Sequence, residues 1–209
     1  MTSLVPSEDM KRLLADRTQE YQSQFEDSQE ALTYWVEQRG LSKDLASHLR
    51  IGYVETPRPG DQRFQGCLTI PYIQPAGVTW MKFRRLTGNG PKYDAVSGLS
   101  GRIYNTPILP TARSLVITEG EIDCATFLEI GIPAVGVPGA NSWKKEWNRI
   151  FRNRKVIVFC DGDEAGAKLG STLTNVIYGC RVVEAPPGED ANSCYLKFGP
   201  EYLREQVGM

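Results

Sequence analysis

The stretch KVIVFCDGDEAGAKLG, Lys155–Gly170, joins an apolar run to two aspartates and then to a helix-forming segment. The run 155–160 is rich in β-branched residues and almost uncharged, which is typical of a buried strand. Asp161 and Asp163 follow it, and residues two apart in an extended segment point the same way. The sequence therefore predicts two carboxylates at the carboxyl end of a strand, with Gly162 between them permitting a tight turn.

Strand-like and helix-like segments alternate on both sides of this stretch. The predicted strands are 114–118, 133–137, 155–160 and 180–185, and the predicted helices are 121–131, 142–153 and 164–179. Strands that alternate with helices of this length favour a parallel sheet covered by helices. In such a sheet, ligands bind beyond the carboxyl ends of the strands. We therefore expect an α/β fold with its site at that edge.

Two further acids follow other predicted strands: Glu119 comes directly after 114–118, and Asp190 follows 180–185. Like charges that lie close together raise each other's pKa unless a cation neutralises them. Carboxylates without nearby His or Cys select Mg²⁺ or Mn²⁺ rather than zinc. The pattern therefore predicts a metal site at the edge where these strands end. The alternative is that Asp161-Gly-Asp163 forms only a solvated turn and a helix cap.

The first half of the chain has a different composition. Residues 1–30 are helical in pattern and carry seven acidic and three basic side chains. Two shorter helices are predicted over 28–40 and 41–52, ended by Gly40 and Gly52, and strands over 67–73 and 77–86 follow. Between Arg63 and Tyr104 there are six basic side chains and one acidic side chain, which indicates binding of nucleic acid. Trp80, Phe83 and Tyr93 interleave with these cations and are predicted to stack on bases. The alternative is an ordinary strand pair with a charged face and an aromatic face that packs in the core.

The whole composition excludes several classes of protein. The 209 residues are 41% hydrophobic and 23% charged, as in ordinary globular domains. No segment approaches the ~20 apolar residues of a membrane span or the core of a signal peptide, so we expect a cytoplasmic protein without a membrane partner. The five cysteines form no C-x-x-C pair and there is one histidine, which argues against a structural zinc site. The regular alternation of strands and helices is found only in the second half of the chain, which predicts two domains, 1–110 and 111–209.

The acidic motifs resemble the Toprim domain, which DnaG-type primases, type IA and II topoisomerases, RecR-like repair proteins and some nucleases share. VITEGEIDCATFLEIGIPAVGVPG followed by KVIVFCDGDEAG has a glutamate after one strand and D-x-D after a later strand, as that family does. The resemblance covers residues 113 to 198. It implies that Glu119, Asp161 and Asp163 are catalytic and bind the metal, and that Asp190 is a further ligand or supports the ligands.

The flanking sequences are similar to DnaG-like primases and to the primase part of bacteriophage primase-helicases. The stretches that carry this likeness are TEGEID, PPGEDANSCYLKFG, YWVEQRGLSKDLASHLRIGYV and CLTIPYIQPAGVTWMKFRRLTGNGPKY. The resemblance implies a Toprim domain preceded by a mixed α+β basic subdomain. In that subdomain, an arginine and the lysine of P-K-Y contact template and nucleotide, which corresponds to Arg85 or its neighbour Arg84, and to Lys92. Asn192 matches the asparagine of a late D-x-N motif that begins at Asp190, and the resemblance implies that it contacts template or nucleotide.

This likeness implies Mg²⁺-dependent synthesis of RNA primers from ribonucleoside triphosphates on a single-stranded DNA template, in the host cytoplasm during phage replication. The sequence shows neither a zinc-ribbon nor a G-x-x-x-x-G-K-[ST] motif. A separate helicase or zinc-ribbon protein is therefore an expected partner, and without one we expect extension of a supplied primer, or weak priming without site preference. The alternatives are a Toprim-type metal-dependent nuclease and a non-catalytic single-strand-binding adaptor of the replisome.

Overall fold

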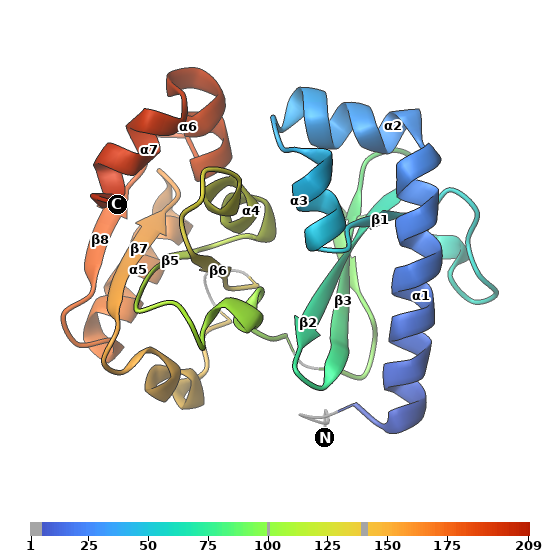
Figure 1. Cartoon of the computed structure of the whole chain (residues 1–209), viewed down its shortest axis with the longest axis horizontal. Coiled ribbons are helices and arrows are strands. Elements are labelled where there is room, and N and C mark those ends of the chain that lie inside the picture. The colour runs from blue at the N-terminus through green and yellow to red at the C-terminus, as the bar shows by residue number, and fades with distance from the viewer. Residues whose placement is uncertain (1–5, 100, 139–141) are drawn as a thin grey trace. The chain divides into compact units, whose positions relative to one another are not determined.

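The computed structural model describes residues 6–99, 101–138 and 142–209, which fall into two compact units, Met1–Arg102 and Ile103–Met209. Each unit contains a four-stranded sheet (Figure 1). The structure divides between Arg102 and Ile103, whereas the sequence places the change at 110/111. The reason is that residues 103–109 join the second core: Ile103 and Leu109 are buried in it, and Tyr104 bridges to Gly136.

The first unit is an antiparallel sheet with a long helix, α1 (Glu8–Asp27), packed against it. The strands are β1 (Gly52–Tyr53), β2 (Cys67–Gln74), β3 (Gly77–Arg85) and β4 (Tyr93–Ala95), in the order β1-β2-β3-β4. Ser7 caps α1, and Leu14, Tyr21 and Phe25 are buried along the length of the helix. The acidic first 30 residues thus supply a core helix of this unit.

Shorter helical segments complete the first unit. They are α2 (Gln29–Leu32), the π-helical η1 (Thr33–Gln38), α3 (Lys43–His48) and the 3₁₀ turn η2 (Gln62–Phe64). The helical segment predicted over 28–40 is confirmed, since Ser28 caps its start and Gly40 follows its end with φ +66°. Gly52, predicted as a helix stop, instead lies in β1, where a Cβ atom would come within 2.6 Å of the carbonyl carbon of Tyr21. Its lack of a side chain permits close contact between α1 and β1.

The second unit is the parallel sheet that the sequence predicts. Its elements are η3 (Thr106–Ile108), β5 (Ser114–Thr118), α4 (Glu121–Glu129), β6 (Ala134–Gly136), η4 (Lys145–Phe151), β7 (Lys155–Cys160), α5 (Glu164–Val176), β8 (Arg181–Glu184), α6 (Ala191–Phe198) and α7 (Pro200–Val207). The strand order is β6-β5-β7-β8, and every pair is parallel. The helix predicted over 142–153 is the shorter 3₁₀ segment η4.

Helices cover both faces of this sheet. Val156 and Val158 share one core cluster with Leu169 and Leu173 of α5 and with Phe151 at the end of η4. On the other face, the ring of Phe127 in α4 lies 5.3 Å from that of Phe159, and α4 in turn packs against α6. Helices therefore cover both faces of the sheet, and in sheets of this kind ligands bind at the carboxyl ends of the strands. Over the part of the chain that the structure describes, no helix is both long and apolar enough to cross a membrane.

Candidate active site and basic face

The register of the parallel sheet brings the predicted acids to one edge. β5 and β7 are neighbours, with Thr118 paired to Phe159. Glu119 follows this pair by one residue along its strand, and Asp161 follows it by two. Because both strands run in the same direction, the two side chains are at the same carboxyl edge.

The loop after β8 returns to the same edge and brings Asp190 there. The backbone N–H of Gly162 donates to the carbonyl of Glu189 at 2.8 Å, and the N–H of Gly188 donates to the carbonyl of Gly162 at 2.9 Å. A Cβ atom on Gly162 would lie 2.0 Å from the carbonyl oxygen of Pro186. Gly162 is therefore needed for this close approach, and the positive φ of a tight turn is not the reason, since its φ is not in the positive range.

Two of the acids also cap helices. An oxygen of the Asp163 carboxylate accepts a hydrogen bond from the N–H of Gly166 at 2.8 Å, at the start of α5. At the start of α6, Asp190 accepts from the N–H of Ser193 at 2.6 Å, and the Ser193 hydroxyl accepts from the N–H of Asp190. Asp163 thus has the capping role that the alternative interpretation gives it, and its role as a metal ligand stays a prediction. A cap uses one carboxylate oxygen in each case and fixes the direction of the other.

The electrostatics of Asp161 show that these carboxylates influence one another. Burial and then the negative charges of Asp123, Glu119, Asp190 and Asp163 raise the pKa of Asp161 from 3.8 to about 8. Both effects disfavour the charged form, burial by desolvation and the neighbours by repulsion. The charged form of Asp161 is therefore destabilised by its burial and by the other carboxylates at this edge.

Asp123 is the member of this group that sequence reasoning missed. The sequence suggests only a helix-start charge, yet Asp123 is 8% exposed on α4, and its charge raises the pKa of Asp161 more than that of Glu119 does. One of its oxygens accepts from the N–H of Asn192 at 3.2 Å. Asp123 lies in the first turn of α4, which begins two residues after Glu119, and this closeness to the strand end is the signal that points to it.

Asn192 has a structural contact that the sequence did not indicate. Its side chain is completely buried and donates to the hydroxyl of Thr126 at 2.9 Å, which joins α6 to α4. The backbone N–H of Asn192, which donates to Asp123, helps to hold that carboxylate in position. The predicted contact between Asn192 and a nucleotide stays a prediction.

The donor set of this edge fits a hard divalent cation. Carboxylate oxygens are the ligands that Mg²⁺ and Mn²⁺ prefer, and a cation would neutralise the charges that raise the pKa of Asp161. Among residues 6–99, 101–138 and 142–209, no three His, Cys, Asp or Glu side chains form a group already arranged to hold a metal ion. The charges of the edge thus fit the ion, whereas the side-chain positions are not those of a closed metal cage.

A cluster of cations and tyrosines lies on one face of the first unit's sheet. We call it the cation–tyrosine cluster, and its members are Tyr34, Arg39, Lys82, Arg84, Lys92 and Tyr93. The guanidinium of Arg84 lies 5.2 Å from the ring centroid of Tyr34 and 5.1 Å from that of Tyr93, and it donates to the Tyr93 hydroxyl. The Lys82 ammonium lies 4.6 Å from the Tyr93 ring, and the Arg39 guanidinium 5.0 Å from the Tyr34 ring.

The structure separates the two arginines that the sequence leaves open. Arg84 belongs to the cation–tyrosine cluster, and Lys92, which is exposed, lies 5.9 Å from the same Tyr93 ring. Arg85, one residue further along β3, donates to the carbonyls of Arg63, Gln65 and Thr87 and so ties loops together. The structure therefore brings Arg84 and Lys92 together and gives Arg85 a different environment.

The aromatic residues of this section also separate. Tyr93 is 37% exposed, whereas Trp80 and Phe83 are buried in the core at 7% and 0%. The ring of Phe83 stacks on Phe64 at 3.6 Å, and that of Trp80 packs edge-on against Tyr72 at 4.7 Å. Of the three aromatics that the sequence suggests for base stacking, only Tyr93 is accessible. Tyr34 and Arg39 come from η1 and its end, so no pattern in the strands reveals them.

Comparisons with known proteins agree with this geometry. Residues 116–195 match the family described as Toprim-like. The chain is 38% identical over 151 residues to Gene 57 protein of Mycobacterium phage D29, covering 69% of this chain and 99% of that protein. It is 29% identical over 101 residues to DNA primase DnaG of Thermofilum pendens, covering 48% of this chain and 24% of that primase. The solved DnaG primase catalytic domain bound to ssDNA superposes with a TM-score of 0.77 at 20% identity, covering 95% of this chain and 80% of that one.

The fold is that of a DnaG primase catalytic core, and residues 116–195 of the second unit match the Toprim-like family. The chain belongs to the same family as Gene 57 protein of Mycobacterium phage D29. It spans nearly all of that phage protein but only about a quarter of the Thermofilum primase.

Proposed function

We propose that this chain synthesises RNA primers on single-stranded DNA from ribonucleoside triphosphates during phage DNA replication in the host cytoplasm. The observation that carries the proposal is the convergence of acids at the carboxyl edge of β5, β7 and β8. There the negative charges of Glu119, Asp163 and Asp190 contribute to the raised pKa of Asp161. Such an edge suits transfer of a nucleotidyl group, because the reaction develops negative charge on phosphate oxygens and on the leaving pyrophosphate.

In this proposal Glu119, Asp161, Asp163 and Asp190 hold Mg²⁺ or Mn²⁺. A bound ion of this kind lowers the pKa of a primer 3′-hydroxyl and stabilises the charge of the leaving pyrophosphate. The chain's own contribution is orientation. Asp163 and Asp190 are held by the first turns of α5 and α6, and Asp161 lies beside them at the end of β7.

The first unit would bind the template through the cation–tyrosine cluster. The exposed Lys92 attracts a backbone phosphate, and the accessible Tyr93 ring offers a surface on which a base stacks. Arg84, at 8% exposure, adds positive charge behind this surface and holds Tyr93 through its hydrogen bond to the Tyr93 hydroxyl. The likeness to a DnaG catalytic domain solved with single-stranded DNA supports this assignment. Contacts of this type carry little sequence information. We therefore expect a separate helicase or zinc-ribbon protein to bring template recognition.

The test is a primer assay with the full chain. Single-stranded DNA, the four ribonucleotides with one labelled, and Mg²⁺ or Mn²⁺ are incubated with and without an annealed RNA primer. We expect extended primers with the native protein and with Asp16→Asn, an exposed control on α1, and none with Asp161→Asn. Shortened DNA would instead identify a nuclease, and bound but unchanged DNA would identify a binding protein.

A further inference from the structure

A second surface of the second unit lies away from the acidic edge. The end of η4 and the end of α5 enclose a hollow of about 320 Å³. Arg152 and Asn153, which line it, precede the first residue of β7, whereas Asp161 follows the last. A strand of this length spans roughly 20 Å, so the hollow and the acidic edge are at opposite ends of the strand.

The hollow has an apolar floor and a polar rim. Phe151, Val176 and Ile177 form the floor, and Asn148, Arg152 and Asn153 contribute polar groups. At the mouth stands Tyr178, whose side chain is fully exposed at 104% of its reference area. A large aromatic ring that projects into water beside an apolar hollow is typical of a protein interaction site.

The segment that leads into the hollow is strongly basic. Residues 142–155 contain six basic side chains and one acidic side chain, although the whole chain has a net charge of −1. Arg154 is bound within the fold, since it donates to the carbonyls of Ile150 and Ala112. Lys145, Arg149, Arg152 and Lys155 are exposed.

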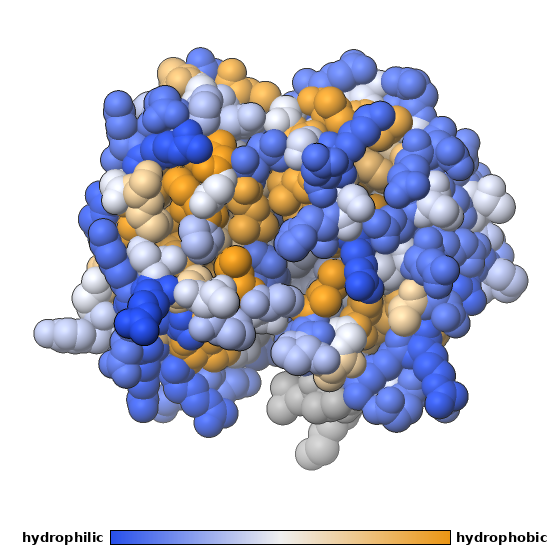
Figure 2. Space-filling view, viewed as in Figure 1, coloured by the Kyte–Doolittle hydropathy of each residue, from blue (hydrophilic) through white to orange (hydrophobic). Residues whose placement is uncertain are grey.

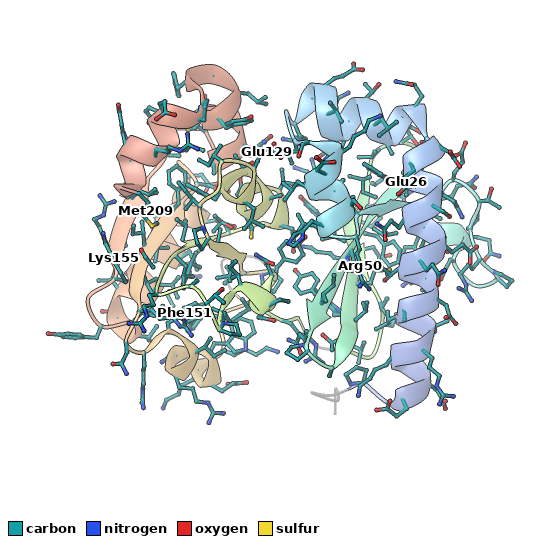
Figure 3. All side chains as sticks on the ribbon, viewed as in Figure 1. Glu26, Arg50, Glu129, Phe151, Lys155 and Met209 are labelled. Carbon is teal, nitrogen blue, oxygen red and sulfur yellow. The ribbon has the colours of Figure 1, made fainter. Side chains whose placement is uncertain are left out.

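The views of the molecule agree with this distribution. Figure 3 places Phe151 and Lys155 in the same lower part of the second unit. In that region the space-filling view shows strongly hydrophilic side chains gathered around smaller apolar areas (Figure 2). Hydrophilic side chains thus surround apolar ones at this end of the unit.

We propose that this hollow binds an acidic peptide segment of a partner protein, with one bulky apolar side chain of that segment inserted over Phe151, Val176 and Ile177. The apolar floor removes the inserted side chain from water, which supplies affinity, and the exposed cations attract the acidic flanks, which supplies specificity and a fast encounter. Tyr178 closes the mouth over the inserted group. The size of the hollow suits a single side chain.

Nucleic acid fits this surface less well. The phosphates of a nucleic acid would contact only the cations. An inserted base would place its polar edge against the apolar floor, where that edge finds no hydrogen-bond partner, which is unfavourable. The surface is also at the opposite end of β7 from the acidic edge, so a template strand at that edge has no need to reach it. The acidic peptide uses both the floor and the rim.

The test measures fluorescence anisotropy of a labelled ten-residue peptide of aspartate and glycine that ends in phenylalanine, with the full chain at low salt. We expect saturable binding that weakens with salt, and a roughly tenfold weaker affinity for Arg152→Glu and for Tyr178→Ala. The charge-matched control Arg12→Glu, on the exposed side of α1, should change affinity less than about twofold. A lysine-for-aspartate peptide should prefer Arg152→Glu to the native chain.

Three results would overturn the proposal. One is no binding of the peptide to the native chain. Another is equal binding of a peptide with alanine in place of phenylalanine, because the hollow would then play no part. The third is an equal loss of oligo-dT binding in Arg152→Glu and Tyr178→Ala, which would assign the surface to nucleic acid. Both variants leave the acidic edge and the cation–tyrosine cluster intact, so this measurement is independent of the priming assay.

Discussion

At the scale of single residues, Asp161 combines burial with four negative neighbours. Its folded-state pKa of about 8 lies above the ordinary value of 3.8. Between these two values the folded chain keeps a proton that the unfolded chain has released. Because the folded state then binds more protons, its stability falls as the pH rises through this window.

We therefore predict that, in chelator, the melting temperature of the second unit falls by a few degrees between about pH 5 and pH 8. Asp161→Asn should flatten this decrease, because the amide has no proton to lose. Millimolar Mg²⁺ at pH 8 should raise the melting temperature of the native chain and leave that of Asp161→Asn nearly unchanged. Circular dichroism melts measure all three effects. A variant as pH-sensitive as the native chain would contradict the assignment, and Asp16→Asn is the control.

The two adjacent arginines of β3 differ in their expected roles. Lys92→Ala should weaken binding of single-stranded DNA and reduce the slope of log affinity against log salt by about one. Arg84→Ala should also weaken binding, because Tyr93 loses its hydrogen-bond partner, with a smaller change in the slope. Arg85→Ala removes hydrogen bonds to the carbonyls of Arg63 and Gln65, so it should lower stability by about 1–3 kcal/mol and leave the salt slope unchanged.

Anisotropy titrations of labelled oligo-dT at several salt concentrations, combined with urea unfolding, separate these outcomes. If Arg85→Ala reduced the salt slope as much as Lys92→Ala, the assignment of DNA binding to the cation–tyrosine cluster would be wrong.

At the scale of elements, α5 and α6 are capped by two of the carboxylates that we propose as metal ligands, Asp163 and Asp190. Asp163→Ala and Asp190→Ala lose both the cap and the charge, and each should cost about 1 kcal/mol of stability. Asp163→Asn and Asp190→Asn keep a good capping side chain and lose only the charge.

The asparagine variants should therefore melt near the native temperature in chelator, with Asp163→Asn losing primer extension and Mg²⁺ stabilisation. Thermal melts and the primer assay measure the two properties in parallel. An active Asp163→Asn would show that this aspartate serves α5 alone.

The close approach between Gly162 and the loop after β8 is another element-scale constraint. In Gly162→Ala the new Cβ would overlap the carbonyl oxygen of Pro186, so we expect a loss of about 1–3 kcal/mol and a shift of Asp161. Gly179→Ala is the control: it strains a backbone with φ +71° at a cost of about 1–2 kcal/mol but meets no atom within 4 Å. Mg²⁺ should stabilise Gly179→Ala and fail to stabilise Gly162→Ala in the same melts.

The elements of the second unit follow closely from the sequence pattern. The predicted strands 114–118 and 155–160 coincide with β5 and β7. Buried parallel strands are continuous apolar runs, which makes them easy to distinguish from the mixed sequence on either side. The segment 142–153 is less well predicted. Its aromatic spacing suits a helix, but Trp147 and Phe151 are fixed by tertiary packing, which favours a 3₁₀ segment.

The candidate site could be predicted only in part. The acids after β5, β7 and β8 lie where the pattern places them, since the sheet brings strand ends together. Asp123 and Tyr34 could not be found in this way, because their contribution depends on how α4 and η1 lie against the sheets. The choice between Arg84 and Arg85 is likewise a matter of which face of β3 each side chain occupies.

At the scale of the whole molecule, each unit has its own core and a separate stabilising network. In the first unit, Asp61 is completely buried and accepts hydrogen bonds from Arg17 at 2.8 and 2.5 Å and from the Tyr21 hydroxyl at 2.7 Å. Asp61→Asn would leave the charge of Arg17 buried without its counter-ion. Breaking a buried ion pair in this way costs about 3–5 kcal/mol.

Calorimetry should therefore show two transitions, of which Asp61→Asn lowers only that of the first unit. Mg²⁺ should raise only that of the second unit, and the fragment 103–209 should keep this Mg²⁺ response without binding oligo-dT. A single transition that moves as one in Asp61→Asn would contradict independent units.

The different sheets of the two units also have a consequence for folding kinetics. β2 and β3 pair across a two-residue turn, so their contacts close a very short loop. β5 and β7 pair only after a helix, a strand and η4 have been placed between them, and loop-closure entropy slows such non-local pairing. The antiparallel unit, which also leaves the ribosome first, should reach its native state before the parallel one. The cation–tyrosine cluster would then exist in the nascent chain before the acidic edge does.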